Sequence, residues 1–439
     1  MELLTFFEKW WSSIKAPTIP HYGRSIHALP NPKEQELFDL SATAFSANDI
    51  LLGYRYFLES LQHSDDPKHL ELNINSDTIT FKLMQGSALI HGQVTEKEFK
   101  AYAQIAQASV LHVAMKRRFL ERNFQLTYCH FSQNDDIITL GIKFRNTTIT
   151  PQKIFFPLRE LALNADFEKE FIASEFEASA LLEYDHLTAL DHPKLHFYYS
   201  TMHEWIATTK SSLVGLLSND NNGMASFSYL ALLLQIDYLL IPHKKMAKDI
   251  NEKINVYFME DEKLTQDKNS DLESYLDELE AMSFETFSTQ FYSAPTTFSP
   301  FDQAMHDDIA EFIDESLAKV RWYKNNHINY VITTIYRYIA LYILFNYGVH
   351  PSLRALFHLH IQIYASDFFA ALGETTLYDS TLKVFQKKSI SDAIDTALAP
   401  YQKRYKNLRN FANELNYSDL DHFSQSFYLQ VKNLDYQEL

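Results

Sequence analysis

Three histidines recur at helical spacing near the middle of the chain: His192, His196 and His203, with Tyr199 between them. Positions four and seven residues apart lie on one helix face, so these imidazoles can converge on a single metal ion. No carboxylate or cysteine at metal-ligand spacing completes the set, and Pro193 places His192 at the start of the helix. His196 and His203 are therefore either metal ligands or histidines that merely share a face, and the incomplete ligand set favours the second interpretation.

Residues for covalent or cofactor chemistry are sparse. The sequence contains no Gly-x-Ser-x-Gly, no P-loop and no Gly-x-Gly-x-x-Gly. Strand alternation directs the single cysteine, Cys129, and the neighbouring His130 to opposite faces, which excludes a Cys–His dyad between them. The carboxylates between Asp307 and Glu315 lack an accompanying Glu-x-x-His pair and are typical of a solvated helix face. The sequence thus predicts no cofactor and favours a non-catalytic protein, with an enzyme of unrecognised family on the histidine-rich face as the alternative.

Aromatic side chains are the stronger candidates for binding. Trp and Tyr are favoured at protein interfaces because they combine an apolar ring with a polar group, although most aromatics in a domain are buried. Residues 1–15 have the pattern of a short amphipathic helix, which docks on its own protein, binds a partner or lies on a membrane surface. A tyrosine-rich helical segment lies near residue 336. The candidate partner-binding residues are Phe7, Trp10, Trp11, Trp322 and Tyr336.

The net charge of the chain restricts the classes of partner that it can bind. A formal net charge of −17 repels phosphate backbones, so nucleic acid is not expected as a partner. One cysteine excludes an intrachain disulfide and suits the reducing cytoplasm. Against this acidic background stands one basic cluster, formed by Lys116, Arg117, Arg118 and Arg122.

The elements that must position these residues fall into three regions. Residues 1–45 are predicted to form the N-terminal amphipathic helix and a proline-rich extended arm. Residues 46–176 alternate between helical and strand periods: a helix over 48–62, a hairpin over 70–83, a strand over 88–94, and a helix over 95–123 that opens on the capping-box pair Thr95 and Glu98. Strands follow over 124–130, 138–144 and 149–156, and Pro157 begins the last helix. Alternation within each strand predicts an antiparallel sheet with helices on one face.

This order of helix, strands, helix, strands and helix resembles that of the bacterial type III secretion chaperones, small α+β modules that bind extended segments of client proteins. The resemblance covers residues 47–176 and lies in topology and hairpin spacing. It implies a chaperone-like module, but those chaperones are usually free-standing, whereas here about 260 residues follow. Dimerisation and client binding are therefore not carried over, and no site residue is transferred.

Residues 177–439 are helical in pattern almost throughout, without a fixed repeat, which predicts a large irregular all-α domain. Residues 328–347 are apolar enough to test as a membrane span, but Arg337 at their centre favours a buried bundle helix. Residues 260–300 begin acidic and become rich in Ser, Thr and Phe, typical of a solvated surface linker, with a docking peptide as the alternative.

The fold class predicted is thus α+β, with an N-terminal sheet module followed by a helical half. For function, the sequence favours a protein-binding adaptor, chaperone or assembly component in the cytoplasm. A membrane-surface protein that uses Phe7, Trp10 and Trp11 is a further alternative. The oligomeric state is left open.

Overall fold

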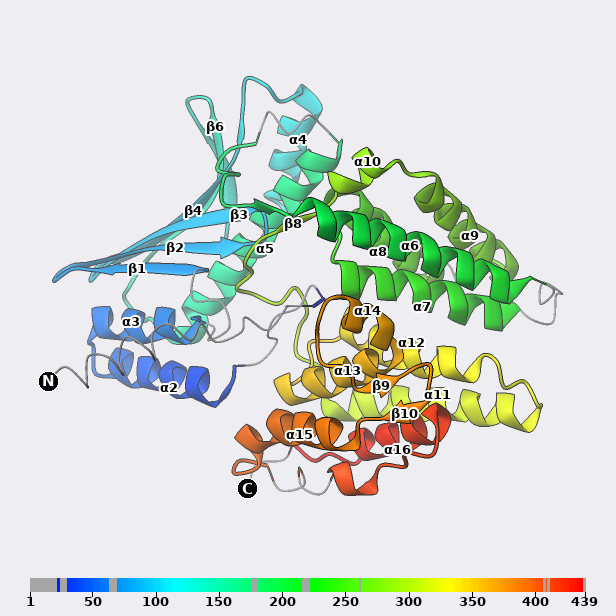
Figure 1. Ribbon diagram of the computed structural model, residues 1–439. Helices are drawn as coiled ribbons and strands as arrows, with labels where there is room; N and C mark the ends of the chain where they lie inside the picture. Colours follow the sequence, from blue (N-terminus) through cyan, green and yellow to red (C-terminus); the bar gives the residue numbers. More distant parts are fainter. Residues whose placement is uncertain are drawn as a thin grey trace, which may run out of the picture.

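The computed structural model describes residues 22–23, 30–62, 69–175, 181–214, 222–259, 262–405, 408 and 411–436. It is an α+β protein whose sheet module lies beside a large helical half, as Figure 1 shows. Two hydrophobic cores match this division. The first gathers buried residues between 45 and 172 together with Phe298. The second gathers Tyr22 and buried residues between 195 and 434.

The module is built on a six-stranded antiparallel sheet of order β1-β2-β3-β4-β6-β5. Helices α3 and α5 cover one face, and the other face exposes side chains such as Lys82, Gln93 and Tyr102. The predicted buried and wet faces are therefore confirmed. The strands are β1 Leu70–Ile74, β2 Thr78–Gln85, β3 Ala88–Thr95, β4 Glu98–Gln107, β5 His130–Asn134 and β6 Ile137–Arg145; the helices are α2 Pro32–Ser46, α3 Ile50–Ser60, α4 Val113–Arg122 and α5 Pro151–Glu175.

The predicted helix over residues 95–123 is wrong in its first half. Thr95 Oγ1 does accept a hydrogen bond from Glu98 N at 3.2 Å, as a capping box requires, but this bond closes the turn between β3 and β4. The side chains of Phe99, Ala101 and Ala103 alternate into the core, and period-two burial stabilises a strand there instead of a helix. The helical part, α4, begins only at Val113.

Three other boundaries also differ. Residues 32–46, predicted as part of an extended arm, form helix α2, which Asn31 caps by accepting hydrogen bonds from Lys33 N and Glu34 N. Residues 124–129 precede β5 as a turn. The segment 149–156 is not a strand, because α5 begins at Pro151 and carries Pro157 inside it. Burial of Ile154 and Leu158, four residues apart, favours the helix.

The helical half consists of two packed groups, with α6–α10 above α11–α16 in Figure 1, and its main internal contact joins α7 to α12. Pro242 lies between α7 and α8. The helices are α6 His192–Leu213, α7 Asn222–Leu240, α8 Lys244–Met259, α9 Thr265–Ala281, α10 Phe284–Ser288, α11 His306–Asn325, α12 Ile332–Asn346, α13 Pro351–Tyr364, α14 Ser366–Ala371, α15 Lys387–Leu398 and α16 Leu420–Lys432. Short elements complete it: β7 Thr188–Ala189, β8 Tyr292–Ser293, β9 Tyr378–Asp379, β10 Val384–Phe385, and the 3₁₀ helices η3 Ala399–Tyr401 and η4 Phe411–Glu414.

The apolar segment 328–347 contains α12, whose side chains Ile335, Ile339 and Ile343 are fully buried in the second core. Within the described ranges, α7 is the one helix long and apolar enough to cross a membrane, and 83% of its apolar window is buried inside the protein. Core helices of this kind pass the same test of length and composition.

Candidate functional site

The histidine face of α6 packs against aromatic rings. His196 stacks on Phe284 with ring centroids 3.8 Å apart, His192 lies edge-on to His196, and His203 contacts Tyr199. Among the described residues, no three His, Cys, Asp or Glu side chains are placed to hold a metal ion. The geometry thus gives no support to metal binding at His196 and His203, and their shared face is part of the contact between α6 and α10.

The aromatic candidates divide by exposure. The side chain of Trp322, at the end of α11, is 57% exposed and lies edge-on to Tyr323. Tyr336 is fully buried, and its hydroxyl donates a hydrogen bond to Asp421 Oδ1 at 3.0 Å, so its assignment to a partner-binding surface is wrong. An aromatic ring packed inward by its helix supplies core area instead. Phe7, Trp10 and Trp11 lie outside the described residues.

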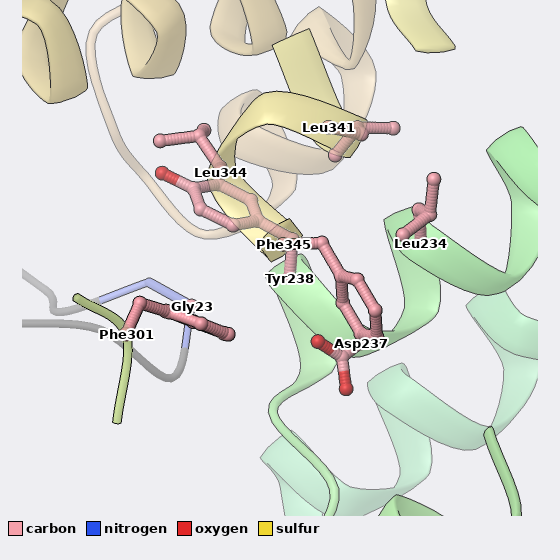
Figure 2. A pocket seen from close by; sticks show the side chains of 8 residues that line it. All are labelled: Gly23, Leu234, Asp237, Tyr238, Phe301, Leu341, Leu344 and Phe345. Carbon is pink, nitrogen blue, oxygen red and sulfur yellow. The ribbon is translucent and has the colours of Figure 1, made fainter. Parts of the chain in front are cut away.

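The two best-formed pockets among the described residues are too small for a substrate. The two best-formed ones each enclose about 10 Å³, room for a single water molecule, against the roughly 300 Å³ or more of a small-ligand site. Figure 2 shows the lining of the first pocket, with Leu234 of α7 and Leu341 of α12 on one side and Gly23 beside Phe301 on the other. Gly23 has φ +76° and lies against the ring of Tyr238, where a side chain would not fit.

A serine and a histidine meet in the second core, but they are enclosed. Ser424 Oγ lies 3.1 Å from His360 Nε2, and the hydroxyl of Tyr428 lies 3.3 Å from His360 Nδ1. All three residues are fully buried, and burial lowers the pKa of His360 to about 3, so the imidazole is neutral at physiological pH. The group satisfies polar atoms within the core and offers a substrate no access.

A cluster of buried ionisable groups with shifted pKa values, Asp166, Lys169 and Glu170, lies where the two halves meet. Asp166 Oδ1 accepts hydrogen bonds from Ser87 N and Ser87 Oγ, both at 2.7 Å. Burial, together with the charge of Glu170, raises the pKa of Asp166 to about 7. Burial also raises the pKa of Glu170 and lowers that of Lys169 to about 8. These three residues lie within one turn of α5, so the helix brings its own charges together at this contact.

Partners for this cluster come from the helical half and from the segment that leads to it. Tyr292 Oη donates to Glu170 Oε1, and Lys244 N donates to Glu170 Oε2 at 2.6 Å. Lys169 Nζ donates to the carbonyl of Glu183 at 3.1 Å. Perturbed pKa values mark functional sites or structural ion clusters. Asp166 bonds Ser87 within the module, whereas Glu170 and Lys169 bond the helical half and the segment that leads to it, so these two residues connect the two halves.

A second connection is the crossover segment, residues 295–302, which belongs to the Ser/Thr/Phe-rich region predicted as a surface linker. Gln85 Oε1 accepts hydrogen bonds from Thr297 N at 3.1 Å and Phe298 N at 2.7 Å, and Gln85 Nε2 donates to Phe298 O. Gly86 N donates to Pro295 O at 3.0 Å. The Phe298 ring is buried in the first core, edge-on to Phe155. The surface-linker interpretation is wrong for these residues, because the segment is docked on the module of its own chain.

Helix α4 presents the exposed feature most suggestive of function. Its inner face buries Met115 and Phe119 in the first core. Arg118 and Arg122 both bond the fully buried carboxylate of Glu168, at 3.0 and 2.9 Å, which fixes α4 on α5. In Figure 1, α4 lies at the opposite end of the module from α2 and α3. The helix is thereby held rigidly, with its other face turned outward.

That outer face carries apolar side chains. Val113 is 82% exposed, Leu120 65%, and Phe124, just beyond the helix end, 93%. Arg117 lies between them, and its side chain is 80% exposed. At about 100° per residue, Val113, Arg117 and Leu120 fall within roughly 60° of one another on α4, and Phe124 follows just after the helix end. We call Val113, Arg117, Leu120 and Phe124 the α4 surface. Single exposed apolar residues are ordinary, but two on one helix face with a third just beyond the helix end make this surface a candidate contact site.

The sequence matches no protein-family model, and no curated protein is similar to it. The candidate site therefore depends on geometry alone.

The basic cluster around Arg117 is evident in the sequence, whereas the apolar side chains beside it were not predicted as a surface. The signal was present, because residues 113, 117, 120 and 124 have spacings of four, three and four. The alternating period of residues 124–130 predicts a strand there, and the predicted helix begins at residue 95, so neither prediction separates this short helix.

Proposed function

We propose that this chain is a non-catalytic protein-binding component, an adaptor, chaperone or assembly factor of the cytoplasm, and that the α4 surface is its principal contact. The observation that carries the proposal is the exposure of three apolar side chains, each more than half exposed: Val113 and Leu120 on the outward face of α4, and Phe124 just beyond its end. Leaving such side chains in water forgoes about 1.5 to 3 kcal/mol each relative to burial, which a bound partner would recover.

The fixing of α4 supports the same proposal. Two arginines share the buried Glu168, and the Arg118 guanidinium lies 4.1 Å above the ring of Phe171, so the outer face is held in one orientation. A preorganised surface binds at a smaller entropic cost than one that must order first. The order of elements in the module, similar to that of chaperones that bind other proteins, agrees with this role.

Trp322, near the end of α11, and Tyr330, just before α12, are two further exposed aromatic residues. Trp and Tyr are enriched among residues that dominate binding energy at interfaces. Both belong to the helical half, so each half of the protein offers a surface to partners.

Site-specific photocrosslinking tests the proposal. A photoreactive phenylalanine analogue replaces Phe124 in the full-length chain in its native cell, and a matched analogue replaces Leu382, which is 71% exposed in the helical half. We expect one protein to crosslink at position 124 and not at position 382. Once purified, that protein should bind the wild-type chain. Its affinity for the Leu120→Ser variant should be at least tenfold lower, and its affinity for the Leu382→Ser variant should equal that for wild type. Equal binding to the two serine variants would contradict the proposal.

A further inference from the structure

We propose that the turn between β2 and β3 is a proton-sensitive clamp between the two halves, which holds the crossover segment while Asp166 is protonated and loosens when Asp166 ionises. Gln85, Gly86 and Ser87 form this turn, which we call the Gly86 turn. The inference goes beyond the proposed function, because it concerns the contact between the two halves and not the α4 surface. It follows from what the Gly86 turn bonds on one side and from what lies against it on the other.

On one side the Gly86 turn bonds the crossover segment. Gly86 N donates a hydrogen bond to Pro295 O at 3.0 Å. The side chain of Gln85 accepts hydrogen bonds from Thr297 N and Phe298 N and donates one to Phe298 O. The amides of Gly86, Thr297 and Phe298 therefore report directly whether the turn and the crossover segment are in contact.

On the other side the Gly86 turn lies against the carboxyl group of Asp166. Ser87 N and Ser87 Oγ both donate hydrogen bonds to Asp166 Oδ1 at 2.7 Å. Gly86 has φ +51°, and a Cβ at this position would lie 2.5 Å from both carboxyl oxygens of Asp166, so no larger residue fits. A displacement of the turn away from Asp166 would also displace the amide that bonds Pro295.

The charges around Asp166 oppose its ionisation. Glu170 lies one turn further along α5, and burial together with the charge of Glu170 raises the pKa of Asp166 to about 7. Lys169 is fully buried between them in sequence, and its ammonium donates to Glu183 O at 3.1 Å. The remaining titratable groups of this contact are His91 on β3, which pairs with the Glu183 carboxylate, Tyr184 and His186 before β7, Lys244 on α8 and Tyr292 on β8.

Ionisation of Asp166 therefore favours an open turn, in which the carboxylate reaches water and moves out of a site shared with a second carboxylate. Asp166 titrates near pH 7 in the closed state and near pH 4 when it is exposed to water. The free energy of opening thus falls as pH rises from about 4 to about 7 and is nearly constant above that range. His186, whose Nε2 lies 3.0 Å from Gly86 O, acts with the opposite sign: burial lowers its pKa, so its protonation at acidic pH also opposes the closed state.

Hydrogen exchange of the full-length chain, measured by mass spectrometry, tests the clamp. The protection of the Gly86, Thr297 and Phe298 amides is expressed relative to the intrinsic exchange rate at each pH, for wild type and for Asp166→Asn. This variant keeps an oxygen that accepts from Ser87 and removes the titration. We expect the ratio of wild-type to variant protection to fall at least tenfold from pH 5 to pH 7 and less than about threefold from pH 7 to pH 9. Both proteins contain His186, so the ratio cancels its contribution.

Two controls accompany this comparison. The Asn75 amide donates to Thr78 O at 2.9 Å in the turn between β1 and β2, away from Asp166, and its ratio should not change with pH. Asp136→Asn alters the exposed carboxylate that bonds Ser109, and the three reporter amides should keep their wild-type pH dependence in this variant.

Glu170→Gln tests the inference without changing Asp166. It removes the negative charge that opposes ionisation of Asp166 and keeps an oxygen for the hydrogen bond from Tyr292. The fall in protection of the reporter amides between pH 5 and pH 7 should therefore be smaller in this variant than in wild type.

Three results would overturn the inference. One is a ratio of wild-type to Asp166→Asn protection that is the same at pH 5 and pH 7. Another is an equal fall in that ratio at Asn75, which would show that the whole module loosens and not the Gly86 turn. The third is a fall in Glu170→Gln as large as that in wild type, because the repulsion between the two carboxylates would then have no part in the opening.

Discussion

The side chain of Gln85 pairs with the backbone of Phe298 as a neighbouring strand would: its Oε1 accepts a hydrogen bond from Phe298 N at 2.7 Å and its Nε2 donates to Phe298 O at 3.2 Å. These residues lie more than two hundred positions apart. Gln85 ends strand β2 of the module, and Phe298 follows β8 of the helical half. The two halves are thus joined by a buried contact, and the Phe298 ring completes the core of the module.

Phe298→Ala should destabilise the module by about 3 to 5 kcal/mol, the usual cost of removing a buried phenylalanine. Urea unfolding measures this change. Limited proteolysis should also show faster cleavage between residues 295 and 302, because the segment loses its anchor. Phe258→Ala, at a side chain that is 39% exposed, serves as the control and should cost far less. Equal effects of the two substitutions would show that the 295–302 segment is not held by its ring.

Asp166 gives stability a defined pH dependence. Its carboxyl ionises near pH 4 in the unfolded chain and near pH 7 in the folded one, because burial disfavours the charge. Between these values the folded state binds a proton that the unfolded state does not, so its contribution to stability falls as pH rises from about 4 to about 7. Asp166→Asn keeps the oxygen that accepts from Ser87 and removes the charge. Thermal denaturation at pH 5 and 8 should show a smaller loss of stability in this variant than in wild type.

Asp136 provides a control of opposite sign. It accepts hydrogen bonds from Ser109 N and Ser109 Oγ, both at 2.6 Å, just as Asp166 does from Ser87, but it lies at the surface. The Ser109 hydrogen bonds lower the pKa of Asp136. Its contribution is therefore present at neutral pH and is lost as pH falls below about 4. If Asp166→Asn and Asp136→Asn change the pH profile in the same direction, burial is not the cause of the Asp166 shift.

Glu168→Gln should destabilise the protein by about 2 to 4 kcal/mol, because Arg118 and Arg122 would lose the one carboxylate that both bond in a buried site. Glu121→Gln is the matched control. It breaks the exposed pair with Arg117 and should change stability by less than about 1 kcal/mol. Chemical denaturation measures both. A loss in Glu121→Gln as large as that in Glu168→Gln would contradict the account of how α4 is fixed.

Tyr336→Phe and Trp322→Ala should have different effects on stability and on partner binding, because Tyr336 is a core residue and Trp322 a surface residue. The first removes the hydrogen bond to Asp421 and should cost about 1 kcal/mol of stability without changing partner binding. The second should leave stability within about 0.5 kcal/mol and reduce binding of any partner that uses the helical half. Stability from urea titration and affinity from calorimetry give the two quantities. Loss of binding in Tyr336→Phe alone would reverse these roles.

Much of the fold follows from periodicity in the sequence, because alternation defines β1, β2, β3 and β6, and helical spacing defines most helices of the second half. Thr95 shows where local signals fail: its hydroxyl bonds Glu98 N equally well at a helix start and in a hairpin turn, and only the burial of Phe99 and Ala101 distinguishes them. The contact between the two halves could not be predicted from the sequence for a different reason. A contact such as Gln85 with Phe298 is tertiary, and no pattern near either residue encodes it.

The candidate site residues show the same contrast between what a local sequence pattern predicts and what tertiary packing decides. Helical spacing correctly places His192 and His196 side by side on α6, yet Phe284, from another helix, occupies the face on which a metal would have to bind. Tyr336 and Trp322 have equally suitable chemistry, and tertiary packing alone buries one and exposes the other.

The central claim, that this chain binds a protein through the α4 surface, is tested most directly by comparing two leucine substitutions of similar exposure. The crosslinked partner is titrated against wild type, Leu120→Ser and Leu382→Ser by isothermal calorimetry. The account predicts an unchanged affinity for Leu382→Ser and a loss of at least tenfold, about 1.4 kcal/mol, for Leu120→Ser. Identical affinities for all three proteins would contradict it.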